Sequence, residues 1–139
     1  MSFLLDTNVI SEVSKPNPDP GVLQWLDELD EDRTFLSVVT LAEIRRGIGL
    51  MDEGKRRKAL AEWFETELID RFEGRLLAID EKTALIWGDL LSASKKRGVA
   101  LSTMDGWIAA TALARDLTLA TRNVKDFEPH QVQVFNPWP

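Results

Sequence analysis

The sequence has no cysteine and only one histidine, His130, which follows a proline near the C-terminus. The absence of cysteine excludes disulfides, thiolate metal sites and cysteine nucleophiles. One histidine cannot build a multi-histidine zinc site, and it leaves little room for a Ser-His-Asp triad. A metal site in this chain would therefore use oxygen ligands, which hard cations such as Mg²⁺ or Mn²⁺ prefer.

The sequence also lacks a long apolar run and an excess of positive charge. No uninterrupted apolar stretch approaches the roughly 18 residues that span a bilayer, and no basic region precedes the short apolar run at the N-terminus. We therefore expect a cytoplasmic protein with no membrane segment. The net charge of −6 argues against indiscriminate coating of nucleic acid, because that requires clustered Lys and Arg. A nuclease is still compatible with this charge.

The chain alternates short apolar strands with amphipathic helices. Its 139 residues, of which 44% are hydrophobic, can bury one good core, so we expect a single domain over residues 1–139. Apolar periodicity predicts strands at 2–5, 34–37, 76–79, 117–120 and 132–135, and helices at 22–29, 41–51, 55–68, 84–91 and 105–113. This alternation predicts an α/β fold with a mostly parallel central sheet, covered by helices on both faces.

Three carboxylates occupy equivalent places in this pattern. Asp6 ends the first apolar run, and Glu43 and Asp105 each stand near the start of a predicted helix. In an open α/β sheet, the carboxyl ends of the strands and the first turns of the following helices meet in one crevice. We therefore predict that these acids converge there, together with Asn123, which follows a later strand.

Each acid also has a purely structural interpretation. Thr40-x-x-Glu43 and Ser102-x-x-Asp105 both match the shape of a capping box, in which the acid reaches back to the start of its own helix. Asp6 could open an Asx turn where the first strand ends. Each segment taken alone leaves both interpretations open.

Three converging carboxylates would need a cation. Like charges a few ångströms apart raise one another's pKa, so the cluster would repel or stay partly protonated unless a divalent ion neutralised it. Such an ion suits phosphodiester hydrolysis, because it can orient a water and stabilise charge on the phosphate oxygens. Gly47, one turn after Glu43, and Gly106, beside Asp105, would leave room for a ligand or would only let helices pack closely.

Three segments resemble the signature blocks of PIN-domain ribonucleases. They are LLDTNVIS at 4–11, TLAEIRRG at 40–47 and DGWIAATA at 105–112. Their order and spacing look most like the VapC and FitB-like toxins of bacterial type II toxin–antitoxin pairs, and the similarity extends to VFNPW at 134–138. The resemblance implies a three-layer α/β/α PIN-like domain that acts as an Mg²⁺-dependent endoribonuclease toxin, with Mn²⁺ as the alternative ion.

The resemblance also implies roles by position. Asp6, Glu43 and Asp105 match the family's acidic metal-binding triad, with Asp6 and Asp105 as direct ligands and Glu43 as a ligand or as a general base through water. Asn123 occupies the fourth catalytic position, where many relatives have aspartate. Asp126, three residues further on, is a candidate substitute for it.

The resemblance extends to further residues and to partners. Thr7 and Thr121 match hydroxyl positions that border the site and could orient water or phosphate. Arg45, Arg46 and the basic stretch 55–58 could guide the RNA backbone, and such binding should weaken as salt rises. The resemblance further implies a homodimer inhibited by a small antitoxin, with operator DNA contacted only through that antitoxin.

Two other functions stay open on the residues alone. Asp6 at a strand end would also suit an acidic-pocket Mg²⁺ phosphatase or a receiver-like domain, although position 8 is Asn where such a phosphatase has a second aspartate. The five tryptophans would also suit a non-catalytic protein-interaction module, because Trp is enriched at interfaces. For Trp25, Trp63 and Trp87, which lie on periodic helices, we expect core positions instead.

Overall fold

The computed structural model describes residues 1–139 and contains one five-stranded sheet. Its strands are β1 (Phe3–Leu5), β2 (Thr34–Ser37), β3 (Leu76–Leu77), β4 (Thr118–Ala120) and β5 (Val134–Phe135). They lie in the order β3-β2-β1-β4-β5, and every neighbouring pair is parallel. The predicted parallel sheet is confirmed, and β1 occupies its centre.

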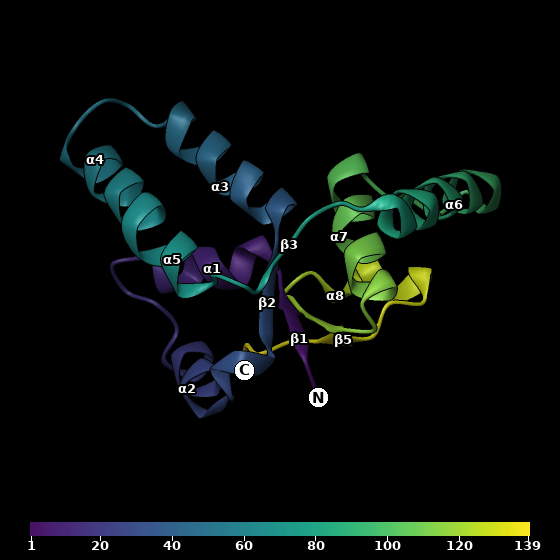
Figure 1. Cartoon of the computed structure of the whole chain (residues 1–139), viewed down its shortest axis with the longest axis horizontal. Coiled ribbons are helices and arrows are strands. Elements are labelled where there is room, and N and C mark those ends of the chain that lie inside the picture. The colour runs from purple at the N-terminus through teal and green to yellow at the C-terminus, as the bar shows by residue number, and fades with distance from the viewer.

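Helices cover both faces of this sheet, as Figure 1 shows. On one side lie α1 (Thr7–Val13), α2 (Pro20–Glu28), α3 (Val38–Leu50), α4 (Lys55–Glu62) and α5 (Ile69–Arg71), and on the other lie α6 (Glu81–Arg97), α7 (Thr103–Ala114) and α8 (Val124–Phe127). The remaining turns are η1 (Glu31–Arg33) and η3 (Glu128–His130), which are 3₁₀, and the π-helical stretch η2 (Trp63–Leu68). The fold is the predicted three-layer α/β/α arrangement. None of the helices combines the length and the apolar character that crossing a membrane requires.

β1 is buried on both faces because its residues are all apolar. Phe3 and Leu5 pack into one core cluster with residues of α1, α3 and η2, whereas Leu4 packs into a second cluster with residues of α7. Successive side chains of a strand point to opposite faces, so a strand between two helical layers must be apolar throughout. The two core clusters therefore fix β1 in place and bring its C-terminal end to the middle of one sheet edge.

Local capping fixes where several helices begin and end. Asp19 accepts hydrogen bonds from two backbone N–H groups in the first turn of α2, at 2.8 and 3.2 Å, and Pro20 is the first residue of that helix. The proline-rich turn before α2 therefore ends in a helix start. α6 ends at Gly98, whose φ of 68° is left-handed and favours glycine.

Two glycines near the predicted site have different surroundings. A Cβ at Gly106 would lie 2.5 Å from the Leu91 side chain and 3.1 Å from the Trp87 ring, so this glycine lets α7 pack closely against α6. A Cβ at Gly47 would meet no atom within 4 Å. Gly106 therefore serves the close packing of two helices, whereas Gly47 leaves open space beside α3.

Several predicted elements differ from the structure, most clearly two strands and one helix. The strand predicted at 76–79 pairs only at Leu76–Leu77, and the strand predicted at 132–135 pairs only at Val134–Phe135. Both are edge strands. Val132 packs in the core without joining the ladder, whereas Ala78 and Ile79 are exposed. The helix predicted over 55–68 widens into π geometry at Trp63.

The tryptophans predicted to lie in the core are only half-buried. Trp25 and Trp63 pack against the margin of the first core cluster. Trp87 instead stacks on Trp107, with ring centroids 4.4 Å apart, at the contact between α6 and α7. Large indole rings thus cover the edges of the core and leave its centre to aliphatic and phenyl side chains.

Candidate active site

Asp6 stands at the C-terminal end of β1 and caps α1. Its backbone N–H donates to Ala120 of β4 at 2.9 Å, and its Oδ1 accepts from the Thr7 backbone N–H at 2.8 Å. Its Oδ2 accepts from the Thr121 hydroxyl at 2.7 Å and from Asn8 Nδ2 at 3.4 Å. With a side chain only 5% exposed, Asp6 is a buried carboxylate whose two oxygens are both oriented by neighbours.

The environment of Asp6 disfavours the ionised form of its carboxyl group. Burial is the main cause that raises its pKa from 3.8 to about 6. Hydrogen bonds from Thr121 and from the Thr7 backbone lower the pKa, and the nearby charges of Glu43 and Asp105 raise it. The two other predicted acids are therefore close enough to act on Asp6.

Glu43 is held at this site by the side chain of Thr7. The Thr7 hydroxyl donates to Glu43 Oε1 at 2.7 Å and lies 3.2 Å from the hydroxyl oxygen of Thr40. α3 begins after Ser37, whose side chain is the N-cap, so Glu43 lies in the second turn. The interpretation of Thr40-x-x-Glu43 as a capping box is therefore wrong.

Asp105 combines a helix start with a place at the site. The Ser102 side chain caps α7 and accepts the Asp105 backbone N–H at 3.1 Å, which is the first half of the predicted capping box. Burial raises the pKa of the half-buried Asp105 carboxyl, the Ser102 hydroxyl lowers it, and the charge of Asp126 raises it. Asp126 of α8 therefore lies close enough to act on Asp105.

Thr121 and Asn8 tie the loop after β4 to the start of α1. The fully buried Thr121 hydroxyl accepts from Asn8 Nδ2 at 3.2 Å and from the Asn123 backbone N–H at 3.0 Å, while it donates to Asp6. Asn8 Oδ1 accepts the Arg122 backbone N–H at 3.3 Å. The side chain of Asn123 itself is exposed and makes no capping bond to α8.

The sequence suggested Thr40 only as a helix cap, whereas its side chain is fully buried and reaches the Thr7 hydroxyl across 33 residues of sequence. The available signal was its helical spacing, because a residue three positions before Glu43 lies on the same face of α3. Asn8, close after the first strand, holds this region through its hydrogen bonds to Thr121 and Arg122.

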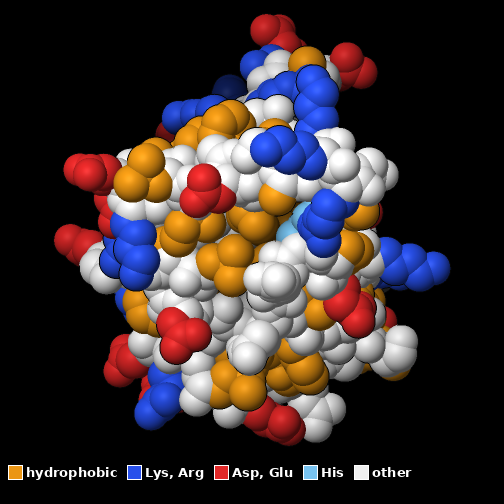
Figure 2. Space-filling view, turned by 90° about the vertical axis from the view of Figure 1, so that its right-hand side faces the viewer, with side chains coloured by type: hydrophobic (Ala, Val, Ile, Leu, Met, Phe, Trp, Pro, Cys, Tyr) orange, Lys and Arg blue, Asp and Glu red, His pale blue; other side chains and the backbone are white.

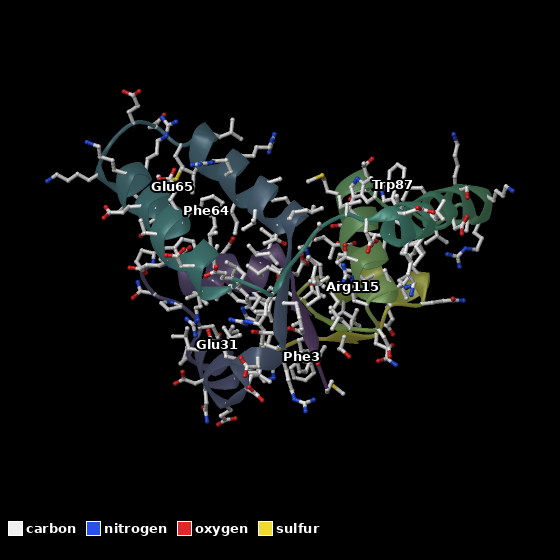
Figure 3. The ribbon with its side chains drawn as sticks, in the orientation of Figure 1. Phe3, Glu31, Phe64, Glu65, Trp87 and Arg115 are labelled. Atoms are coloured by element: carbon white, nitrogen blue, oxygen red, sulfur yellow. The ribbon has the colours of Figure 1, made fainter.

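The two arginines predicted to guide RNA differ in their surroundings. Arg45 Nη1 donates to Glu65 Oε1 at 2.8 Å, and its guanidinium lies 5.3 Å from the centre of the Phe64 ring. Figure 3 labels these two partners, Glu65 and Phe64. Arg46 is exposed and makes no ion pair. Of the two, only Arg46 offers an uncommitted charge.

The acids of the site suit a hydrated cation better than an all-protein metal cage. No three acidic or histidine side chains are gathered closely enough to hold one ion by themselves. Mg²⁺ commonly keeps several waters and takes only one or two carboxylates from a protein. A buried aspartate with a raised pKa and two further carboxylates acting nearby matches that donor set.

Comparison with known proteins assigns the chain to a family. The PIN domain matches residues 3–128. The chain is 44% identical over 136 residues to the toxin FitB of Neisseria gonorrhoeae, covering 98% of each protein, and 39% identical to the VapC ribonuclease Y4jK of Sinorhizobium fredii, covering 98% of this chain and 97% of that protein. A solved structure of FitAB bound to an IR36 DNA fragment matches with a TM-score of 0.92 at 42% identity, covering 99% of this chain and 96% of that one. The chain therefore belongs to the PIN-domain family, together with the FitB and VapC toxins.

Proposed function

We propose that this PIN-domain protein is a Mg²⁺-dependent endoribonuclease and the toxin of a toxin–antitoxin pair, with residues 1–139 acting as one domain. The observation that carries the proposal is the buried Asp6 carboxylate at the end of the central strand, which is hydrogen-bonded to Thr7, whose hydroxyl in turn donates to Glu43. The sequence similarity supports RNA cleavage and a toxin role, because the relative with 39% identity is named a VapC ribonuclease and the relative with 44% identity is named a toxin.

Asp6 and Asp105 would hold the ion, which is Mg²⁺ in this proposal and Mn²⁺ as the alternative. When bound, the ion lowers the pKa of a coordinated water and offsets charge on the phosphate oxygens. The chain prepares Asp6 for this role through its hydrogen bonds, because the donors Thr121 and Thr7 favour the ionised carboxylate and fix its direction. Burial opposes that ionisation, so a cation is the natural partner of this carboxylate.

Glu43 would orient or deprotonate the attacking water. The Thr7 hydroxyl donates to Oε1 of Glu43 and so turns the carboxylate plane, which leaves Oε2 to accept a proton from water. Asn123 would complete the polar wall of the site. Asp126, whose charge acts on Asp105, would be the acid available for a second ion.

The proposal also includes protein partners and a path for RNA. Arg46 and the basic stretch 55–58 would attract the RNA backbone. The toxin would form a homodimer and would be inhibited by an antitoxin that contacts operator DNA. The solved structure of FitAB bound to a DNA fragment supports the pairing with an antitoxin and the binding of the pair to DNA. Figure 2 shows exposed hydrophobic side chains on the face formed by α6 to α8. Among the exposed residues of these helices, Leu85 of α6 is 64% exposed and Met104 of α7 is 40% exposed. Such side chains are available for a protein contact.

The test uses total bacterial RNA, the purified protein, and the variants Asp6→Asn and Asp105→Asn. We expect cleavage by the wild type with Mg²⁺, no cleavage with EDTA, and at least a hundredfold slower cleavage by either variant, on the order of the loss for an essential charged group. Circular dichroism shows whether each variant is folded. Equal cleavage by folded wild type and variants, or cleavage that EDTA does not change, would refute the proposal.

A further inference from the structure

A groove of about 170 Å³ lies between α1, α3 and α4. Glu43 and Thr7 both form part of its wall, so the groove adjoins the candidate active site. Its volume corresponds to about six water molecules at about 30 Å³ each, well below the roughly 300 Å³ at which pockets for drug-sized molecules begin. The groove therefore has room for one small flat group beside the catalytic acids.

The walls of the groove combine an aromatic ring, apolar side chains and hydroxyls. Trp63 and Met51 contribute apolar surface, and Ser11 contributes a hydroxyl. Trp63 is half-buried and begins the π-helical stretch η2, and such local widenings of a helix are frequent at functional sites. Gly47 also lines the groove, and it adds no side chain to the space.

We propose that this groove receives the nucleobase next to the cleaved phosphodiester bond, and that it thereby selects which RNA sites are cut. The inference rests on the ribonuclease function proposed above. Sequence-specific proteins read unstacked RNA bases by stacking them on aromatic side chains and hydrogen-bonding their edges, and the groove offers Trp63 and Ser11 for these contacts.

The positive charges that would bind the backbone lie outside the groove. Arg46 precedes Gly47 on α3 and is exposed. Lys55, Arg57 and Lys58 line a separate recess at the start of α4, and none of these four cations makes an ion pair. This separation matches a bound nucleotide, with the base in the groove and the phosphates against the basic surface around it.

Two glycines of α3 provide a matched pair of variants. Gly47 lines the groove, and Gly49 does not, although a Cβ at either position would meet no atom within 4 Å. Both lie on an exposed part of the same helix, where leucine is a better helix former than glycine. Gly47→Leu and Gly49→Leu should therefore both melt at or above the wild-type temperature, and only Gly47→Leu should fill the groove.

The experiment incubates each protein with total bacterial RNA and Mg²⁺, sequences the 5′ ends of the products, and measures kcat/KM on the fragment that the wild type cuts most often. We expect Gly47→Leu to lower kcat/KM at the preferred sites about tenfold or more, in line with the loss of one stacked base, and to weaken the base preference at one position beside the cut. Gly49→Leu should keep the wild-type rate and preference.

Three outcomes separate the inference from the function on which it rests. Identical cut sites and rates for Gly47→Leu and Gly49→Leu would overturn the inference and leave the ribonuclease function standing. A uniform loss of rate with an unchanged base preference would also overturn it, because the substitution would then act on Glu43 and not on a bound base. If the wild type cuts no RNA with Mg²⁺, the proposed function itself fails, and the wild-type reaction alone reveals this.

Discussion

Replacing Asp6 with asparagine should stabilise the metal-free protein at neutral pH, although it removes a proposed metal ligand. The amide has the shape of the carboxylate, and its Oδ1 can still accept the Thr7 backbone N–H that now bonds the aspartate at 2.8 Å. Its NH₂ group would face the Thr121 oxygen, which lies 2.7 Å from Asp6 Oδ2 and already accepts from Asn8 Nδ2 and from the Asn123 backbone N–H. The amide can donate to this oxygen only in place of Asn8, because a hydroxyl oxygen accepts two hydrogen bonds. The substitution therefore removes a buried charge and exchanges one hydrogen bond, so the gain from removing the charge is an upper limit.

The size and sign of the effect follow from the pKa of Asp6. Because burial raises this pKa from 3.8 to about 6, the stability that the neutral acid provides is fully present below pH 3.8 and is lost as the pH rises through 6. At about 1.4 kcal/mol per pKa unit, the loss above pH 7 is about 3 kcal/mol. Asparagine does not titrate, so the variant should match the wild type near pH 4 and exceed its free energy of unfolding by up to about 3 kcal/mol at pH 7.5.

Urea unfolding of both proteins in EDTA, from pH 4 to pH 8, measures this difference. Carboxyls with lowered pKa values, such as Asp80 and Glu31, weaken both proteins equally at low pH and cancel in the comparison. Asp89→Asn, at an exposed position of α6, is the control and should differ from the wild type by less than about 0.5 kcal/mol. Two results would refute this reasoning. They are a wild type that is more stable than Asp6→Asn at pH 7.5, and a difference in the free energy of unfolding that is the same at both ends of the pH range. Either result would show that the fold does not disfavour the ionised form of Asp6.

Three further substitutions test other contacts of the site. Gly106→Ala should lower the free energy of unfolding by about 1–3 kcal/mol in urea, because its Cβ would meet side chains of α6 at 2.5 to 3.2 Å. Thr121→Val removes a hydrogen bond that lowers the pKa of Asp6, so the acidic limb of the pH profile of RNA cleavage should move to higher pH. Arg46→Glu should weaken RNA binding in a filter assay at low salt more than Arg45→Glu does, because the Arg45 guanidinium is already paired.

The centre of the fold could be predicted from the sequence because its pattern is local. A run of three apolar residues that ends in Asp6 is typical of a central parallel strand, and the structure confirms it at Phe3–Leu5. The start of α3 was misplaced because Ser37 ends a strand and caps the next helix without any loop between them. Two overlapping helix-start patterns, at Ser37 and at Thr40, then compete, and only packing decides between them.

The contacts that position the acids could not be predicted in the same way. The hydrogen bond from Thr121 to Asp6 spans 115 residues, and the bond from Thr7 to Glu43 spans 36. No spacing within a single segment encodes such pairs, because they depend on which strands become neighbours. Once the order β2-β1-β4 is known, the ends of these strands bring the threonines and the acids together.

One aspartate can both cap a helix and take part in an active site. Two capping aspartates of this protein, Asp80 and Asp6, show how the two roles differ. Asp80 caps α6 and accepts the Thr83 backbone N–H at 2.9 Å, and this bond is the main cause that lowers its pKa. Asp6 caps α1 with an equally short bond, yet its pKa is raised to about 6. A cap alone favours the ionised acid, because the helix N-terminus is positive. The opposite shift at Asp6 therefore comes from its burial beside other acids, which capping does not require and which a cation would relieve.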